Sequence, residues 1–139
     1  MTVHVYSGTI SGGGSGTITV TLGASETCSV VVYKRGSKTI NSSIDIYRQL
    51  ASTNWPVNDD GTTSLTTVSG DEVVTFICTT DTAVSGWTGL TQQVAPTTFG
   101  ARRILSAMTT NAAGGTPEAL YLVTSTTFKN TSAVTLVLR

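Results

Sequence analysis

The chain is poor in charged residues. Asp, Glu, Lys and Arg make up 12% of its 139 positions, against about 25% in an ordinary soluble domain. Eight basic and eight acidic residues balance to a formal net charge of zero. No nucleic-acid partner is expected, because binding to a phosphate backbone needs a clustered positive field. A neutral surface gives little electrostatic resistance to association, which favours a subunit packed against neighbours.

Long hydrophobic runs are also missing. No stretch approaches the roughly 18 consecutive apolar residues that indicate a membrane-spanning helix, so no membrane partner is expected. Residues 1–6 do not form a basic region followed by an apolar run of signal-peptide length. We therefore expect the chain to be made in a cytosol without a signal peptide.

Histidine and cysteine are scarce. His4 is the single histidine and has no obvious nucleophile near it in the sequence, so we interpret it as a surface residue. Cys28 and Cys78 both fall in expected strands. We interpret them as small buried apolar residues, with a bridge between two sheets as the alternative. One histidine and two distant cysteines make no metal cluster, so no metal site is predicted.

Two polar segments resemble ligand-binding loops in composition but not in spacing. Residues 58–61 offer oxygen atoms to calcium, yet they lack the ligand spacing and the distal glutamate of a calcium loop, so a turn is expected. Residues 11–16 are rich in glycine but lack the lysine of a phosphate-binding loop, and we interpret them as a linker. The acidic residues form no recognisable catalytic pair. No catalytic residue and no cofactor are predicted, and the chain is not expected to be an enzyme.

Threonine, in contrast, occupies 28 positions. Residues 17–22 read Thr-Ile-Thr-Val-Thr-Leu, so a strand here would turn its aliphatic side chains to one face and its threonines to the other. β-Branched threonine suits a half-exposed pleated surface and is less favourable in a helix. The pattern predicts an all-β protein with a polar, uncharged exterior.

Turn residues divide the chain into short runs with strand character. We expect strands at residues 2–6, 17–22, 27–34, 38–50, 62–68, 71–79, 101–108, 118–125 and 131–138. Residues 101–108 also fit a short helix, because an apolar run of this length is ambiguous. Residues 54–61 and 80–100 are expected to be loops. Short strands at this spacing predict a single antiparallel β-sandwich of about eight or nine strands, with jelly-roll or immunoglobulin-like wiring.

The length of the chain fits one domain, and its composition divides it into an arm, residues 1–16, and a sandwich, residues 17–139. A first strand on a glycine tether is difficult to hold on its own sheet. It is suited instead to pairing with an exposed strand edge on another subunit. Its candidate contact residues are Val3, Val5 and Tyr6.

Two further groups are candidate contact residues. Trp55 and Trp87 lie in expected loops, and tryptophan is favoured at binding hot spots; the alternative is an indole folded over the edge of the core. Lys34, Arg35 and Lys38 lie at an expected hairpin tip. They could bind an acidic neighbour, although solvated hairpin tips often have this composition.

A neutral chain rich in Thr, Ser, Gly and Val, with a compact β-sandwich, resembles the small virion proteins of tailed bacteriophages. In size and style it is most similar to capsid decoration (cement) proteins. The resemblance covers the whole chain and is one of composition. It implies a place in the virion and binding to the major capsid protein on the outside of an assembled head. It also implies a homo-oligomer, with a trimer favoured. Residues 1–10 and the two tryptophans would then make the contacts.

The main alternative is a carbohydrate-binding or receptor-binding module on a tail fibre or spike. Trp55, Trp87, Tyr33 or Tyr47 would stack on sugar rings, and threonine hydroxyls would accept hydrogen bonds. A coplanar, solvent-facing aromatic pair would favour this alternative. Ice binding by the threonines of residues 17–21 is disfavoured, because their ladder is not repeated at a fixed period.

Overall fold

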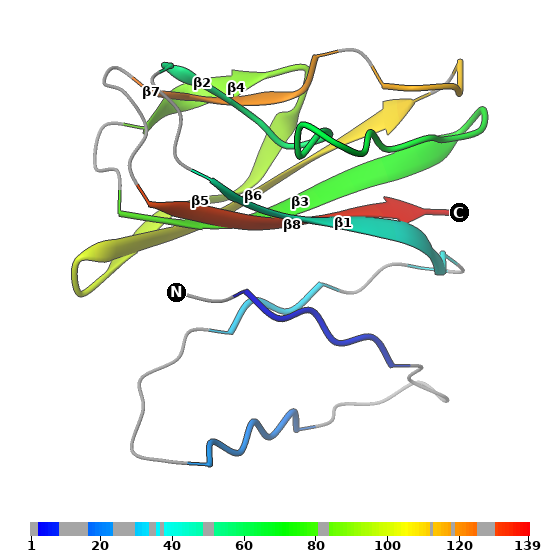
Figure 1. Ribbon diagram of the computed structural model, residues 1–139. Helices are drawn as coiled ribbons and strands as arrows, with labels where there is room; N and C mark the ends of the chain where they lie inside the picture. Colours follow the sequence, from blue (N-terminus) through cyan, green and yellow to red (C-terminus); the bar gives the residue numbers. More distant parts are fainter. Residues whose placement is uncertain are drawn as a thin grey trace.

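A computed structural model describes residues 3–8, 17–23, 30–33, 36, 38–48, 52–80, 84–111, 113–117, 119–124 and 130–139. These residues form eight β-strands and no helix (Figure 1). The strands are β1 (Ile40–Arg48), β2 (Asn54–Pro56), β3 (Asp71–Thr79), β4 (Val84–Thr88), β5 (Thr91–Phe99), β6 (Arg102–Asn111), β7 (Tyr121–Thr124) and β8 (Thr131–Leu138).

The strands build two antiparallel sheets that pack face to face. One has five strands in the order β1-β8-β3-β6-β5, and the other has three in the order β2-β7-β4. In Figure 1 the smaller sheet covers one face of the larger sheet. The predicted all-β sandwich is therefore confirmed.

β8 is an inner strand of the larger sheet, next to the edge strand β1. It pairs with β1 on one side and with β3 on the other. All eight of its residues are buried, because both faces of the sheet are covered at this position. Its aliphatic and β-branched sequence suits such a strand. The predicted bounds of β3 and β8 are confirmed, and strands are also present within or overlapping 38–50, 101–108 and 118–125.

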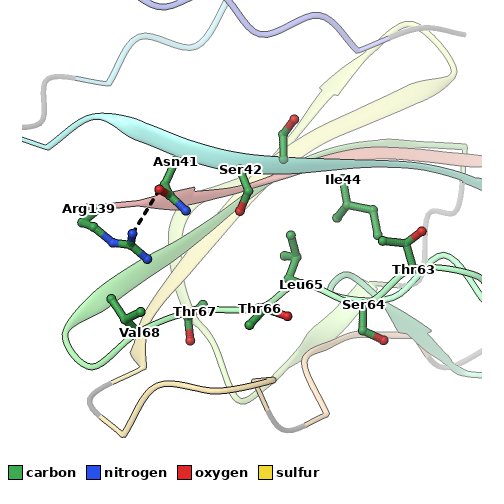
Figure 2. A pocket seen from close by; sticks show the side chains of 11 residues that line it. Asn41, Ser42, Ile44, Thr63, Ser64, Leu65, Thr66, Thr67, Val68 and Arg139 are labelled. Carbon is green, nitrogen blue, oxygen red and sulfur yellow. Dashed lines mark hydrogen bonds between the residues drawn. The ribbon is translucent and has the colours of Figure 1, made fainter.

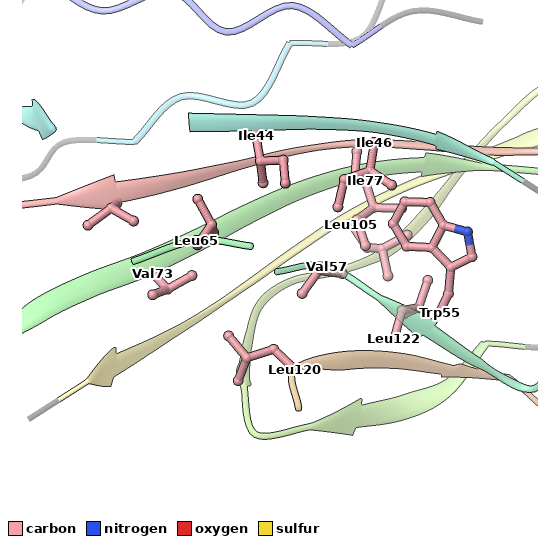
Figure 3. Close-up of a cluster of buried hydrophobic side chains, with 12 residues drawn as sticks. Ile44, Ile46, Trp55, Val57, Leu65, Val73, Ile77, Leu105, Leu120 and Leu122 are labelled. Atoms are coloured by element: carbon pink, nitrogen blue, oxygen red, sulfur yellow. The ribbon is translucent and has the colours of Figure 1, made fainter. Parts of the chain in front are cut away.

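The main core lies between the two sheets (Figure 3). Its members come from both sheets and from the segments after β2 and before β7: Ile44, Ile46, Trp55, Val57, Leu65, Val73, Ile77, Leu105, Leu120, Leu122, Ala133 and Val137. Threonines share the inner face of the larger sheet with them. Thr135 donates a hydrogen bond to Thr75 over 2.9 Å, and the hydroxyls of Thr79 and Thr131 lie 2.8 Å apart.

The opposite face of the larger sheet is apolar as well. Val74 follows Val73 in β3 and therefore points away from the main core. It joins a second buried cluster with Val134, Leu136 and Leu138 of β8. Val3 and Val5 of the N-terminal segment pack against this cluster. The larger sheet is thus covered on one face by the smaller sheet and in part on the other by the N-terminal segment (Figure 1).

Several predicted elements are wrong. Residues 54–56 form β2 rather than a loop, and β4 and β5 occupy much of the expected loop at 80–100. Register shifts in both β4 and β5 interrupt the period of two that would have identified them. Residues 62–68 form no strand and contribute only isolated bridges at Ser64 and Thr67.

The strands expected near the start of the chain are also wrong where the structure describes them. Residues 3–8, 17–23 and 30–33 have no strand assignment. The remainder of the expected strands at 2–6 and 27–34, with Cys28, lies outside the described residues. The pattern of these segments favours strands, but a strand also requires a hydrogen-bonded neighbour.

Candidate interaction surfaces

The structure places Trp55 in the main core. Its side chain is 0% exposed and belongs to the cluster between the sheets (Figure 3). β2 positions it there by pairing with β7, where Trp55 lies opposite Leu122. This corrects its assignment as a contact residue, because Trp55 cannot reach a partner while the sandwich is folded. The alternative, an indole packed into the core, is the one that the structure supports.

Trp87 lies on the same rung of the smaller sheet as Trp55. Leu122 of β7 pairs with Trp55 on one side and with Trp87 on the other. Residues opposite one another on paired strands share a face, so both indoles are on the inner side of this sheet. Trp87 is half-buried against the core, and its Nε1 donates to Gln92 Oε1 over 3.3 Å. The two tryptophans therefore form no coplanar, solvent-facing pair.

Of the expected basic tip, only Lys38 lies among the described residues. It is half-buried, and its Nζ donates to the carbonyl oxygen of Gly70 over 3.4 Å. Lys38 is thereby tied to the turn that precedes β3. Lys34 and Arg35 lie outside the described residues, so a basic contact surface stays a prediction.

The N-terminal arm divides into an inner and an outer row. Val3 and Val5 are half-buried against the second cluster, whereas His4 and Tyr6 point to solvent. Tyr6 is 89% exposed, and its ring centroid lies 6.3 Å from that of His4. The arm therefore packs on its own sheet through one row and exposes the other row to solvent.

Tyr33 holds residues 30–33 over the face of the larger sheet on which Val3 and Val5 also pack. Its hydroxyl is hydrogen-bonded to Ser106 of β6. Its ring meets Phe76 of β3 edge to face, with centroids 5.3 Å apart. Tyr33 is thus held by the sheet rather than presented to a ligand. Sequence analysis did not identify this contact, because nothing in the local pattern links residues 33, 76 and 106.

Residues 17–23 carry an exposed apolar row. All seven residues are exposed, and Ile18, Val20 and Leu22 are 60%, 50% and 37% exposed. In Figure 1 the segment lies beyond residues 3–8 as seen from the sheets. Both the aliphatic residues and the threonines of this segment are therefore exposed to solvent.

A groove opens beside β1, between this edge strand and residues 63–68 (Figure 2). Its volume is about 440 Å³. Ile44 and Leu65 lie between its two walls, while Ser42, Thr66 and Arg139 contribute polar groups. The Oγ atom of Ser42 is buried and has no hydrogen-bond partner among the described residues.

Arg139 closes one end of this groove through a pair with Asp71. Arg139 Nε and Nη2 donate to the two carboxylate oxygens of Asp71 over 3.0 and 2.9 Å. The Asp71 side chain is 2% exposed and that of Arg139 is 47% exposed. The hydrogen bond from Arg139, with a second from the backbone N–H of Val68, lowers the pKa of Asp71. The same pair raises the pKa of Arg139.

The remaining polar candidates have local partners. Asp60 Oδ1 accepts hydrogen bonds from the backbone N–H groups of Thr62 and Thr63, each over 2.7 Å, so this carboxylate caps its own loop. Cys78 is half-buried in β3, and burial raises the pKa of its thiol. Among the described residues, no group of three or more His, Cys, Asp or Glu side chains is arranged to hold a metal ion. The same residues include no helix long and apolar enough to cross a membrane.

Comparison of the chain with protein-family models, with curated proteins and with solved structures finds no match in any of the three.

Proposed function

We propose that this chain is a non-enzymatic structural protein of a virion, most like a capsid decoration protein that binds the major capsid protein on the outside of a phage head. The observation that carries the proposal is the exposed aliphatic row of residues 17–23. Apolar side chains gathered on one short segment are poorly placed in water and are stabilised when a partner covers them. Such a protein acts through the surface it offers, and it works as a homo-oligomer, with a trimer favoured.

Two further features support an assembly role. The chain has a formal net charge of zero, which lowers the electrostatic cost of bringing copies and partners together. His4 and Tyr6 add an exposed aromatic pair to the side of the molecule on which residues 17–23 lie. Tyrosine is enriched at interfaces because one end of its ring is apolar and the other is polar.

The test is binding to phage heads assembled without this chain. Purified protein is added to such heads, the heads are sedimented, and their survival on heating or at low salt is measured. We expect the protein to co-sediment at a saturating ratio and to raise survival. The control is the Ile18→Asp/Val20→Asp/Leu22→Asp variant, which should lose both effects. A protein that neither binds nor stabilises heads contradicts the proposal.

The carbohydrate-binding alternative is less well supported, because the aromatic residues named for it do not form a solvent-facing pair. Trp55 is buried, Trp87 is packed against the core, and Tyr33 is engaged with Phe76. Tyr47 is 66% exposed. Among the described residues no second aromatic ring packs beside it, so it forms no pair of rings on which a sugar could stack.

A further inference from the structure

Residues 17–22 have the properties of a strand without a sheet. The segment alternates threonine with aliphatic residues, has no strand assignment, and pairs with none of the described strands. Its backbone N–H and C=O groups are therefore available to a strand edge. β-Strand addition uses such a segment: backbone hydrogen bonds supply affinity, and alternate side chains enter a groove.

β1 is the edge best suited to receive this segment. The larger sheet ends in β1 and β5, and the smaller sheet ends in β2 and β4. β5 contains Pro96 and two register shifts, β4 contains a shift next to Gly86, and β2 is three residues long. Bulges, proline and short length are the features that protect edges from pairing. From Ser42 to Arg48, β1 keeps an unbroken register with β8, so its free edge is regular.

The groove beside β1 fits the aliphatic row. A strand added to β1 continues the larger sheet, and its inward side chains enter the space between the two layers, as Ile44 and Ile46 do. On a strand, Ile18, Val20 and Leu22 would share one face at the required period of two. They would lie above Ile44 and Leu65, between the walls of the groove. The threonines would then face outward, on the side of the exposed Ser43 and Asp45.

Residues 17–23 lie on the side of the molecule to which residues 3–8 and 30–33 are held (Figure 1). Val3 and Val5 hold residues 3–8 on the outer face of the larger sheet, and Tyr33 holds residues 30–33 over the same face. In Figure 1 residues 17–23 lie outside the two sheets on this side. The groove is lined instead by β1 residues and residues 63–68 (Figure 2), so the segment does not occupy the groove of its own chain.

We propose that residues 17–22 of one copy add as a sixth strand to β1 of a second copy, with Ile18, Val20 and Leu22 filling the groove between β1 and residues 63–68. This inference rests on the contact role given to residues 17–23 in the proposed function, and it names the partner as a second copy of this chain. Because the donor segment and the groove lie at different places on the molecule, each copy can donate and accept. The contact therefore builds rings or chains of subunits.

The experiment measures mass in solution by sedimentation over a range of protein concentrations. Wild-type protein should exceed the mass of one chain as concentration rises. Ile18→Asp/Val20→Asp/Leu22→Asp should weaken self-association by at least about a hundredfold, because charges replace buried aliphatic side chains. Thr17→Asp/Thr19→Asp/Thr21→Asp adds the same charge to the outward face and should still associate.

A second pair of variants tests the acceptor. Thr66 is exposed and lines the groove, so Thr66→Arg should block it, while Thr88→Arg on β4 adds the same charge elsewhere and should associate normally. An equimolar mixture of Thr66→Arg with the Ile18/Val20/Leu22 variant retains one intact donor and one intact groove. It should form a species of two chains, in which hydrogen exchange at residues 17–22 is slowed.

Three results would overturn the inference: a wild-type protein of one-chain mass throughout, equal loss of association in both aspartate variants, or a mixture that stays at one-chain mass. Exchange protection of residues 17–22 in a one-chain species would place the strand in its own groove instead. Wild-type protein that stabilises heads but never self-associates would retain the proposed function and reject this contact. Self-association without binding to heads would retain this contact and reject the proposed function.

Discussion

At the scale of the residue, threonine has two environments in this protein. Thr17, Thr19 and Thr21 are exposed, whereas Thr75 and Thr135 are buried on the inner face of the larger sheet. A buried hydroxyl is tolerated where it finds a hydrogen-bond partner, and these two find each other across paired strands. The same residue type therefore covers the outside of the molecule and fills part of its core.

This pairing predicts a non-additive response to substitution. Thr75→Val removes the acceptor of the Thr135 hydroxyl and should cost about 1–3 kcal/mol of unfolding free energy, because a buried donor is left without a partner. Thr75→Val/Thr135→Val replaces both hydroxyls with methyl groups of similar shape and should regain most of this loss. Urea unfolding of the wild type, the single variant and the double variant measures these differences in unfolding free energy. Additive losses in the double variant would contradict the predicted coupling.

Asp71 makes the stability of the fold depend on pH. Its pKa in the folded protein is lowered from 3.8 by its hydrogen bond with Arg139, so the ionised form is the one that the fold favours. The contribution of this pair is complete above pH 3.8 and is lost as pH falls through the lowered pKa.

Asp71→Asn should therefore destabilise the protein at pH 7, and its difference from wild type should shrink as pH falls below about 4. Asp45→Asn, at an exposed position on β1, is the matched control and should change stability little at neutral pH. Unfolding by urea between pH 3 and pH 7 provides the comparison. A difference that stays constant down to pH 3 would show that the carboxylate charge is not the cause.

At the scale of the element, the N-terminal segment acts as a cover for the larger sheet. Val3 and Val5 lie on Val74 and on the aliphatic side chains of β8, whereas His4 and Tyr6 face water. Val3→Ser/Val5→Ser should cost about 1–3 kcal/mol, because apolar area on both sides of the contact becomes hydrated. His4→Ser/Tyr6→Ser should change stability by less than about 0.5 kcal/mol. Equal losses in the two variants, measured by urea unfolding, would exclude this role of the valines.

At the scale of the whole molecule, the fold depends on its last strand more than on its first residues. β8 joins β1 to β3, so removal of residues 131–139 takes away two strand pairings and aliphatic side chains from both clusters. We expect this truncation to abolish cooperative unfolding. Removal of residues 1–10 should leave the sandwich folded at reduced stability and weaken assembly. Thermal unfolding followed by circular dichroism distinguishes the two, and a cooperative transition in the first truncation would contradict the prediction.

Prediction from the sequence succeeded where a strand keeps its period and has clear ends. β3 and β8 are continuous runs of β-branched and aliphatic residues, and their bounds were predicted correctly. β4 and β5 were missed because Gly86, Pro96 and three register shifts interrupt their alternation. Residues 62–68 were wrongly predicted as a strand. Their sequence has strand character, but a sequence pattern does not show whether a partner strand is present.

Among the candidate contact residues, the sequence could identify the residue types but not their exposure. Trp55 lies beside proline and a run of polar residues, which indicates a loop, yet its pairing with β7 places it in the core. Tyr6 was identified as a contact residue and is exposed. The aliphatic row of residues 17–22 was recognised, but its orientation toward water depends on the absence of a paired strand beside it among the described residues.

The sequence alone determined the structural class and the two faces of each regular strand, because alternation is a local property of the extended backbone. Tertiary structure decided which of those faces are buried and which strand edges stay open. Thr75 and Thr135 are 60 positions apart, and nothing in either segment identifies the other as its partner. The same long-range packing buries Trp55 and leaves Ile18, Val20 and Leu22 exposed, because burial depends on neighbours supplied by distant parts of the chain.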